Sequence, residues 1–141
     1  MFERSSGILL PIFSLPSKYG IGTLGKEAYE FIDFLSYAGQ KYWQILPMGH
    51  TSYGDSPYSP FSIFAGNPYF IDLEELSEEG FIEEINLKDI DFSSHECIDY
   101  KKLFDTRYKI LRKAYLNKGM FCNLTAFSEK NPWAMDYALF M

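Results

Sequence analysis

Cysteine and histidine are scarce in this chain of 141 residues, which contains two of each. Cys97 and Cys122 form no Cys-x-x-Cys pair, and His50 and His95 are far apart, so no zinc signature can be assembled from them. Two isolated thiols favour reduced, structural cysteines over a disulfide framework. We therefore expect neither a metal site nor a cofactor.

The chain also has few basic residues and few long apolar runs. The 13 Lys and Arg residues are outnumbered by 19 Asp and Glu residues, which gives a net charge of −6. Nucleic acid is not an expected partner, because no basic face is available to neutralise a phosphate backbone. The apolar residues 8–10 are followed by Pro11, and they fit neither a signal peptide nor a membrane span of ~20 residues. We expect a cytoplasmic protein without a membrane partner.

Aromatic residues, by contrast, are abundant: 2 Trp, 11 Tyr and 13 Phe make up 18% of the chain. The length fits one domain of ordinary size with a buried core. Aromatic-rich, mildly acidic surfaces suit a neutral polar ligand, because aromatic rings stack on apolar ring faces without needing charge.

The first 47 residues show the pattern strand, turn, helix, strand. Residues 7–10 form a short apolar run typical of a strand buried on both faces, and residues 42–46 form another that ends at Pro47. Between them, Thr23 can cap a helix that Gly39 would end. This order predicts one βαβ unit and hence a parallel sheet. The helix should bury apolar residues spaced three and four apart: Ala28, Phe31, Ile32, Leu35 and Ala38.

Residues 48–71 have neither helical nor alternating periodicity, and they predict a long loop. Loops of this length inside compact domains are usually functional. Glycine and proline fix the backbone of this loop, while six aromatic residues supply surface: Tyr53, Tyr58, Phe61, Phe64, Tyr69 and Phe70. The loop leaves the C-terminal end of a parallel strand, which is where ligands bind in α/β folds.

The remaining sequence predicts helices. The acidic residues 77–91 favour short solvated helices, and residues 121–127 favour a further short one. A last helix should have Asn131 as its cap and Pro132 in its first position, and should run to Met141. The strongest helix spans residues 99–118 and should present one apolar face: Tyr100, Leu103, Phe104, Tyr108, Leu111 and Tyr115.

No complete catalytic constellation is visible in the sequence. Retaining glycoside chemistry needs two carboxylates about 5 to 5.5 Å apart, and Asp55 is the only carboxylate within the aromatic loop. In Gly-Asp-Ser-Pro, an Asx turn is the favoured role of Asp55, with direct ligand contact as the alternative. His50 could act as a general base or a ligand donor, but a lone histidine at a strand end more often has a structural role. The Gly-x-Gly-x-x-Gly spacing of residues 20–25 is weak evidence for a nucleotide, because no acidic residue follows at the ribose-reading position.

The residues beside Asp55 suit a sugar, whose ring has one apolar face and an equator of hydroxyls. Tyr53 and Tyr58 each offer a flat apolar face and a hydroxyl, and Ser56 adds a further donor and acceptor. These residue types in one loop point to carbohydrate binding, with core packing of the tyrosines as the alternative.

Three stretches of the chain closely resemble the 4-α-glucanotransferases, the amylomaltase or disproportionating enzymes of glycoside hydrolase family 77. The most specific stretch is the loop with its continuation, YGDSPYSPFSIFAGNPYFIDLEEL at residues 53–76. The upstream residues 5–49 and the downstream WAMDYALF at residues 133–140 look like the same family in the same order. The resemblance is weakest over residues 77–130. It also accounts for the Gly-x-Gly-x-x-Gly spacing, which resembles the family's first βα loop and implies no nucleotide.

The resemblance implies an α/β fold, the (β/α)8 TIM barrel. It also implies an enzyme that transfers α-1,4-glucan segments to the 4-hydroxyl of an acceptor sugar through a covalent intermediate. In the family, Ser56 and Tyr58 would line the substrate cleft beside Asp55, and Tyr53 would take part in glucan binding. The expected partners are therefore maltooligosaccharides or other α-1,4-glucans.

Two short stretches depart from the family's usual sequence. The chain reads His50-Thr51-Ser52-Tyr53 where family members commonly read Pro-Thr-Gly-Tyr. It also reads Pro-Tyr-Ser-Pro-Phe at residues 57–61 where they commonly read Pro-Tyr-Gln-Ser-Phe.

The family's aspartate nucleophile, glutamate acid/base and transition-state aspartate lie on later barrel strands, so no catalytic residue is expected in this chain. We expect an N-terminal fragment with an incomplete barrel, inactive on its own. Residues 1–76 would hold the first βαβ unit and the cleft loop, residues 77–130 a mostly helical inserted subdomain, and residues 131–141 the start of a truncated helix. The alternatives are a non-catalytic α-glucan-binding fragment and an unrelated α/β domain.

Overall fold

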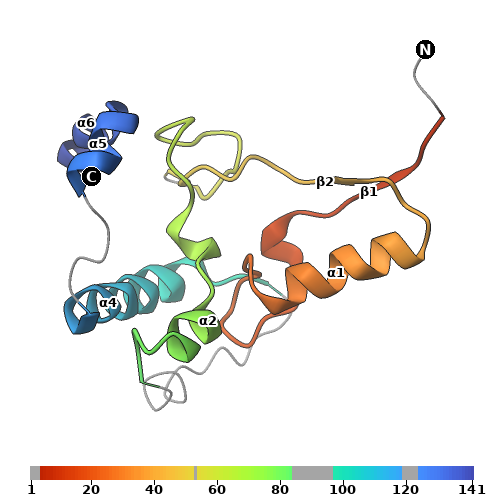
Figure 1. Ribbon diagram of the computed structural model, residues 1–141, viewed down its shortest axis with the longest axis horizontal. Helices are drawn as coiled ribbons and strands as arrows, with labels where there is room; N and C mark the ends of the chain where they lie inside the picture. The colour runs from red at the N-terminus through yellow and green to blue at the C-terminus, as the bar shows by residue number, and fades with distance from the viewer. Residues whose placement is uncertain (1–3, 53, 84–96, 119–123) are drawn as a thin grey trace.

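The computed structural model describes residues 4–52, 54–83, 97–118 and 124–141 (Figure 1). Two strands and α1 lie at one end, α5 and α6 lie at the other, and α2 and α4 lie between and below them. The elements are β1 (Gly7–Leu9), the 3-10 turn η1 (Ile12–Ser14), α1 (Lys26–Tyr37), β2 (Tyr42–Gln44), the 3-10 turn η2 (Pro68–Phe70), α2 (Leu73–Glu78), α4 (Tyr100–Lys118), α5 (Leu124–Lys130) and α6 (Trp133–Phe140).

The strands β1 and β2 pair in parallel, with α1 as the connection between them (Figure 1). Ile8 stands opposite Trp43, and one further bond runs from the Leu10 N–H to the Gln44 carbonyl at 3.0 Å. The βαβ unit and the parallel sheet are therefore confirmed. Each strand is shorter than its apolar run, because the paired segment covers three residues on each side.

The prediction that the first strand is buried on both faces is wrong. All three residues of β1 are exposed, and Leu9 keeps 55% of its surface accessible. Within the described residues the sheet has two strands, so β1 has one neighbour and most of its surface lies open. Apolar composition favours a buried strand, but burial also needs layers on both sides.

The predicted helix cap at Thr23 is also wrong. Helix α1 begins at Lys26 with Gly25 as its N-cap, and no side chain caps it. Thr23 is buried instead, and its hydroxyl donates to the carboxylate of Asp72, far along the chain. The end of α1 is as predicted, since Gly39 follows it with φ +69°. Of the predicted face, Ala28 and Leu35 are buried, Phe31 is half-buried, and Ile32 and Ala38 are exposed.

The glycines of the Gly-x-Gly-x-x-Gly segment serve close packing. A Cβ atom at Gly22 would overlap the carbonyl oxygen of Ile12, and one at Gly25 would overlap the carboxylate of Asp72. These two glycines let the first loop close on itself and on the segment before α2. This explains the spacing without a nucleotide.

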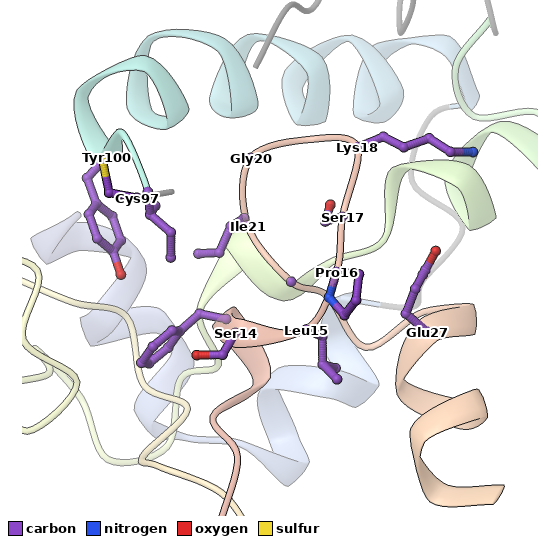
Figure 2. Close-up of a pocket in the computed structure, with 13 residues that line it drawn as sticks. Ser14, Leu15, Pro16, Ser17, Lys18, Gly20, Ile21, Glu27, Cys97 and Tyr100 are labelled. Carbon is purple, nitrogen blue, oxygen red and sulfur yellow. The ribbon is translucent and has the colours of Figure 1, made fainter. Parts of the chain in front are cut away.

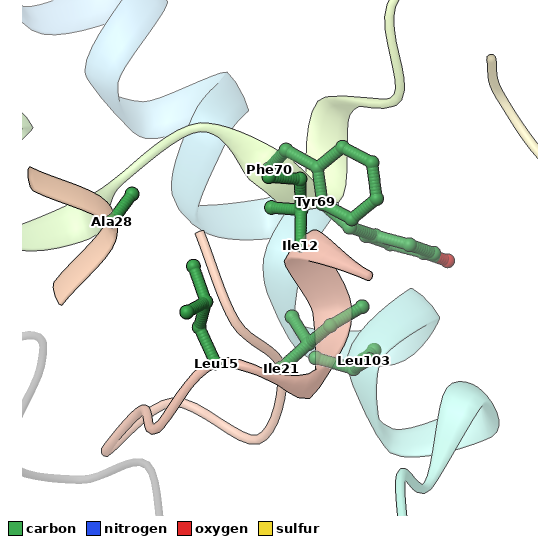
Figure 3. Close-up of a cluster of buried hydrophobic side chains, with 7 residues drawn as sticks. All are labelled: Ile12, Leu15, Ile21, Ala28, Tyr69, Phe70 and Leu103. Atoms are coloured by element: carbon green, nitrogen blue, oxygen red, sulfur yellow. The ribbon is translucent and has the colours of Figure 1, made fainter. Parts of the chain in front are cut away.

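The main core cluster joins three distant parts of the chain (Figure 3). The first loop, η2 and α4 meet there, and α1 adds one small side chain. Its buried residues are Ile12, Leu15, Ile21, Ala28, Tyr69, Phe70 and Leu103. The end of the aromatic loop, at Tyr69 and Phe70, is thus part of the core.

Helix α4 confirms the helix predicted over residues 99–118, but its buried face differs from the predicted one. The buried side chains are Leu103, Arg107, Ile110 and Ala114, spaced four, three and four residues apart. Phe104 and Tyr115, which were predicted to share the apolar face, are 62% and 57% exposed. A charged residue occupies the middle of the buried stripe, which hydrophobic periodicity could not reveal.

Two C-terminal helices are described. Helix α5 covers Leu124–Lys130, and residues 121–123 of the predicted helix lie outside the described residues, as do residues 84–91 of the acidic stretch. Asn131 does not cap α6, because its amide donates to the Phe127 carbonyl at 2.9 Å and α6 begins at Trp133. Within the described part of the chain, no helix has both the length and the apolar character that crossing a membrane requires.

Candidate functional site

The long loop after β2 folds back on itself and is closed at its base. Isolated antiparallel bridges join Gly49 to Gly66 and Thr51 to Pro60. The Asn67 N–H donates to the Met48 carbonyl at 2.8 Å. The loop is therefore held by its own backbone near both ends.

The turn of the loop contains the predicted sugar-binding residues. Asp55 adopts φ +53°, and its N–H donates to the Ser52 carbonyl at 3.0 Å. The Ser56 Oγ accepts from the Tyr58 N–H at 3.3 Å. The Asx turn predicted at Asp55 is wrong, because the acceptor would need the N–H of residue 57, and that residue is Pro57. The described structure shows no hydrogen bond within the turn for the Asp55 carboxylate, which lies in a cavity wall.

Near the end of the loop, the Tyr69 carbonyl accepts a hydrogen bond from Nη2 of Arg107 at 2.8 Å. Arg107 is only 2% exposed, and its Nε and Nη1 atoms have no hydrogen-bond partner among the described residues. Burial lowers the pKa of Arg107 to about 10. The sequence analysis did not identify this residue, since one basic residue within a helix carries no distinctive signal.

His50 lies at the start of the loop and is 6% exposed. Its Nδ1 lies 3.0 Å from the Tyr137 hydroxyl of α6, and its Nε2 lies 2.8 Å from the Tyr108 hydroxyl of α4. Burial lowers the pKa of His50 and raises the pKa of Tyr108 to about 12. With both ring nitrogens engaged, His50 has the structural role that the sequence favoured.

A cavity of about 670 Å³ lies between the loop, α4 and the end of α6. Aromatic rings form much of its wall, and hydroxyls, a carboxylate and an ammonium group are distributed among them. Burial raises the pKa of Tyr69 and of Tyr100, and the nearby Asp55 carboxylate raises both further. The lining residues are His50, Thr51, Ser52, Asp55, Phe61, Tyr69, Tyr100, Lys101, Phe104, Tyr108 and Met141.

The structure brings some of the predicted site residues into this cavity and leaves others beside it. Asp55 is in the wall. Ser56 is half-buried and Tyr58 is 70% exposed, and both lie on the turn next to Asp55 rather than in the wall. Tyr53 lies outside the described residues.

Helix α4 contributes the part of the wall that the sequence analysis missed. Tyr100, Phe104 and Tyr108 follow one another at intervals of four residues and line the cavity. They belong to the face of this helix that was predicted to be apolar. A row of aromatic residues at helical spacing beside a loop rich in turn residues was the available signal.

A second cavity of about 920 Å³ lies on the side of the first loop (Figure 2). Its wall is formed by residues 13–18 and 20–22 with Glu27 of α1, and Tyr100 is shared with the first cavity. Lys18 of this wall is already paired with Glu74 at 2.9 Å. Among the residues that the structure describes, no three His, Cys, Asp or Glu side chains gather as metal ligands would.

Comparison with known proteins gives a consistent result. The sequence profile of glycoside hydrolase family 77, described as 4-alpha-glucanotransferase, matches residues 10–141. A 4-alpha-glucanotransferase of Clostridium butyricum is 52% identical over 92% of this chain and 28% of that protein. One of Streptococcus pneumoniae is 46% identical over 100% of this chain and 29% of that protein.

A solved structure is also similar. The amylomaltase from Streptococcus agalactiae in complex with acarbose superposes with a TM-score of 0.92 at 46% identity. The match covers 99% of this chain and 29% of that one. The chain therefore spans less than a third of the length of the relatives it matches.

Proposed function

Because the chain belongs to the 4-alpha-glucanotransferase family, glycoside hydrolase family 77, we propose that it provides part of the glucan-binding surface of an enzyme that transfers α-1,4-glucan segments. The observation that carries this proposal is the aromatic cavity beside the loop. It lies next to the segment whose sequence most closely resembles the family.

The cavity wall fits a glucose unit. Tyr100 and Phe104 supply ring faces for the apolar face of a sugar, and Asp55 and Ser52 supply acceptors for its hydroxyls. The Thr51 hydroxyl is buried without a hydrogen-bond partner among the described residues. Aromatic walls with a few polar groups are typical of small-molecule sites.

The four residues predicted from the loop extend this surface. Tyr58 exposes most of its ring beside the cavity, and Ser56 stands between it and Asp55 along the chain. With Tyr53, these residues would form the outer part of the glucan site. The acarbose bound to the similar amylomaltase supports a glucan-like ligand for this chain.

The arrangement of β1, α1 and β2 supports a place for this chain in a (β/α)8 barrel. The loop follows β2, at the strand end where such barrels carry their active sites. In this proposal the two parallel strands are the first two of the barrel and the aromatic loop borders its catalytic face.

The reaction proposed for the whole enzyme is a retaining transfer through a covalent glucosyl intermediate. Such a mechanism needs a carboxylate nucleophile and a carboxylic acid that protonates the leaving oxygen. Of the described residues that line the cavity, Asp55 is the one carboxylate. We therefore expect glucan binding by the 141-residue chain without turnover, which is also the outcome that a non-catalytic glucan-binding role would give.

Binding can be tested by titrating the chain with maltoheptaose, with cellohexaose as a control for linkage. Phe104→Ala should weaken maltoheptaose binding about three- to tenfold, since one stacking contact is worth about 0.5–1.5 kcal/mol. Tyr115→Ala is the matched control, because it lies on the same helix, is similarly exposed and is outside the cavity. Equal binding of both sugars, or equal loss in both variants, would contradict the proposed site.

Turnover is tested separately by incubating the chain with maltotriose and analysing the products. Transfer would release glucose and form longer maltodextrins. We expect neither product, and their appearance would show that the chain carries a complete catalytic set.

A further inference from the structure

Three segments of the chain meet at one buried side chain, His50. The residue itself begins the aromatic loop, Tyr108 reaches it from α4, and Tyr137 reaches it from α6. Phe61 of the same loop packs edge-on against the imidazole with ring centres 5.7 Å apart. We call this cluster the His50 junction.

Both nitrogens of the imidazole take part in the junction. A neutral ring has one N–H donor and one bare nitrogen acceptor, and a tyrosine hydroxyl can donate or accept. One tyrosine hydroxyl therefore donates to the ring while the other accepts from it. The ring cannot turn over without breaking both bonds, so the two hydroxyls hold its orientation.

The same three segments build the aromatic cavity. His50 and Phe61 line it from the loop, Tyr108 lines it from α4, and Met141 lines it at the end of α6. Phe61 also packs on Phe140 of α6 with ring centres 5.6 Å apart. The contacts of His50 join the loop, α4 and α6. The spacing between these three segments determines the shape of the cavity.

We propose that His50 is the positioning residue of the glucan site: through one imidazole it fixes α6 and α4 against the aromatic loop and so sets the shape of the cavity. The proposal rests on the proposed function for its ligand, but not for its geometry.

The geometry can be tested without any ligand. Trp133 of α6 stacks on Phe64 of the loop with ring centres 5.7 Å apart, so its fluorescence reports whether α6 stays docked. In a Trp43→Phe background, Tyr137→Phe and His50→Leu should increase acrylamide quenching of Trp133. His50→Gln should restore the wild-type value, because an amide supplies both a donor and an acceptor.

A second readout follows the imidazole itself. In ¹⁵N NMR spectra, Tyr108→Phe should shift the resonance of Nε2 and Tyr137→Phe that of Nδ1, because each variant removes the hydroxyl partner of one ring nitrogen. Tyr115→Phe is the matched control, since this exposed tyrosine of α4 lies outside the junction. The two tyrosine variants are independent tests. If one of them does not fold, the other still tests the proposed role of His50.

Glucan binding is then measured on the same variants. Tyr108→Phe and Tyr137→Phe should each weaken maltoheptaose binding about three- to tenfold, the effect of one hydrogen bond, and His50→Leu should weaken it more. If the wild type binds no maltooligosaccharide, the proposed function fails, and the acrylamide quenching of Trp133 and the ¹⁵N resonances of His50 still test its role. Unchanged quenching and unchanged ¹⁵N resonances in both tyrosine variants would overturn the proposal, as would wild-type affinity in His50→Leu.

Discussion

At the scale of single residues, the buried imidazole of His50 should make stability depend on pH. Its surroundings lower its pKa below the ordinary 6.5, so the folded chain binds fewer protons than the unfolded chain between the two values. The stability is fully present above pH 6.5 and falls as the pH drops toward the folded pKa. The groups that face the ring are the hydroxyls of Tyr108 and Tyr137, which stay neutral in this range.

The measurement is the urea midpoint from pH 7.5 to 5.5 for the wild type and for His50→Gln. The wild-type midpoint should fall more steeply below about pH 6.5, because the glutamine variant has no imidazole to protonate at this position. Parallel curves for the two proteins would contradict the assignment of this pH dependence to His50.

A second residue-scale prediction concerns Arg107, the buried cation of α4. Arg107→Met keeps a side chain of similar length but removes the donor to the Tyr69 carbonyl. Hydrogen bonds from charged groups contribute about 1.5–3 kcal/mol, but Met also removes a buried charge with two nitrogens that have no partner among the described residues, which offsets much of this loss. We therefore expect the free energy of unfolding to fall by less than about 1 kcal/mol. Denaturant melts give this value. Arg112→Met, an exposed arginine on the same helix, should change stability by less than about 0.5 kcal/mol.

At the scale of elements, the contact between the first loop and the start of α2 depends on Asp72. Its Oδ1 accepts from the N–H groups of Glu74 and Glu75 at 2.8 and 2.9 Å, and its carboxylate also accepts from Thr23. One carboxylate thus caps α2 and joins it to the segment that precedes α1. Gly25 makes this possible because it has no Cβ.

Gly25→Ala should therefore displace the Asp72 carboxylate. The loss of an N-cap costs about 1 kcal/mol and the loss of a buried hydrogen bond about as much, so stability should fall by about 2 kcal/mol. Thermal and urea melts measure the change. Gly66→Ala is the control, because a Cβ there meets open space and its φ is not positive. Equal melts for the two variants would show that Gly25 tolerates a side chain.

The secondary-structure elements also show which parts of the fold could be predicted from the sequence. The strand, helix and strand of the first 47 residues, the stop at Gly39 and helix α4 were predictable, because each is specified by neighbouring residues. The role of Thr23 was not, because its partner Asp72 lies 49 residues away. The residues next to Thr23 are equally compatible with a helix cap, but the tertiary contact with Asp72 gives Thr23 a different role.

In the candidate site, too, the features specified by neighbouring residues were predicted and those that depend on distant contacts were not. The loop and Asp55 were found from turn residues and aromatic content, which are local properties. The wall formed by Tyr100, Phe104 and Tyr108 was not, because periodicity identifies a face of a helix without saying what that face meets. Arg107 was missed for the opposite reason, since burial of a charge depends on a carbonyl supplied by another segment.

At the scale of the whole molecule, much of the surface that the described residues expose is apolar. On α1, the exposed fractions are 64% for Tyr29, 59% for Phe34 and 94% for Tyr37, and on α6 that of Leu139 is 84%. The high aromatic content therefore serves a core, a cavity wall and open faces at once.

Exposed apolar faces of this kind drive association, so the 141-residue chain should self-associate at micromolar concentration. Light scattering coupled to size exclusion should give a mass above 16.4 kDa that rises with concentration. Replacing Phe34 and Tyr37 together by lysine should lower that mass, because both side chains project from α1 and are not in the core cluster. Asp33→Lys on the same helix changes the net charge by the same +2 without removing apolar surface, so it distinguishes the effect of apolar area from the effect of charge. A wild-type chain that stays monomeric over this concentration range would show that these faces are tolerated in water.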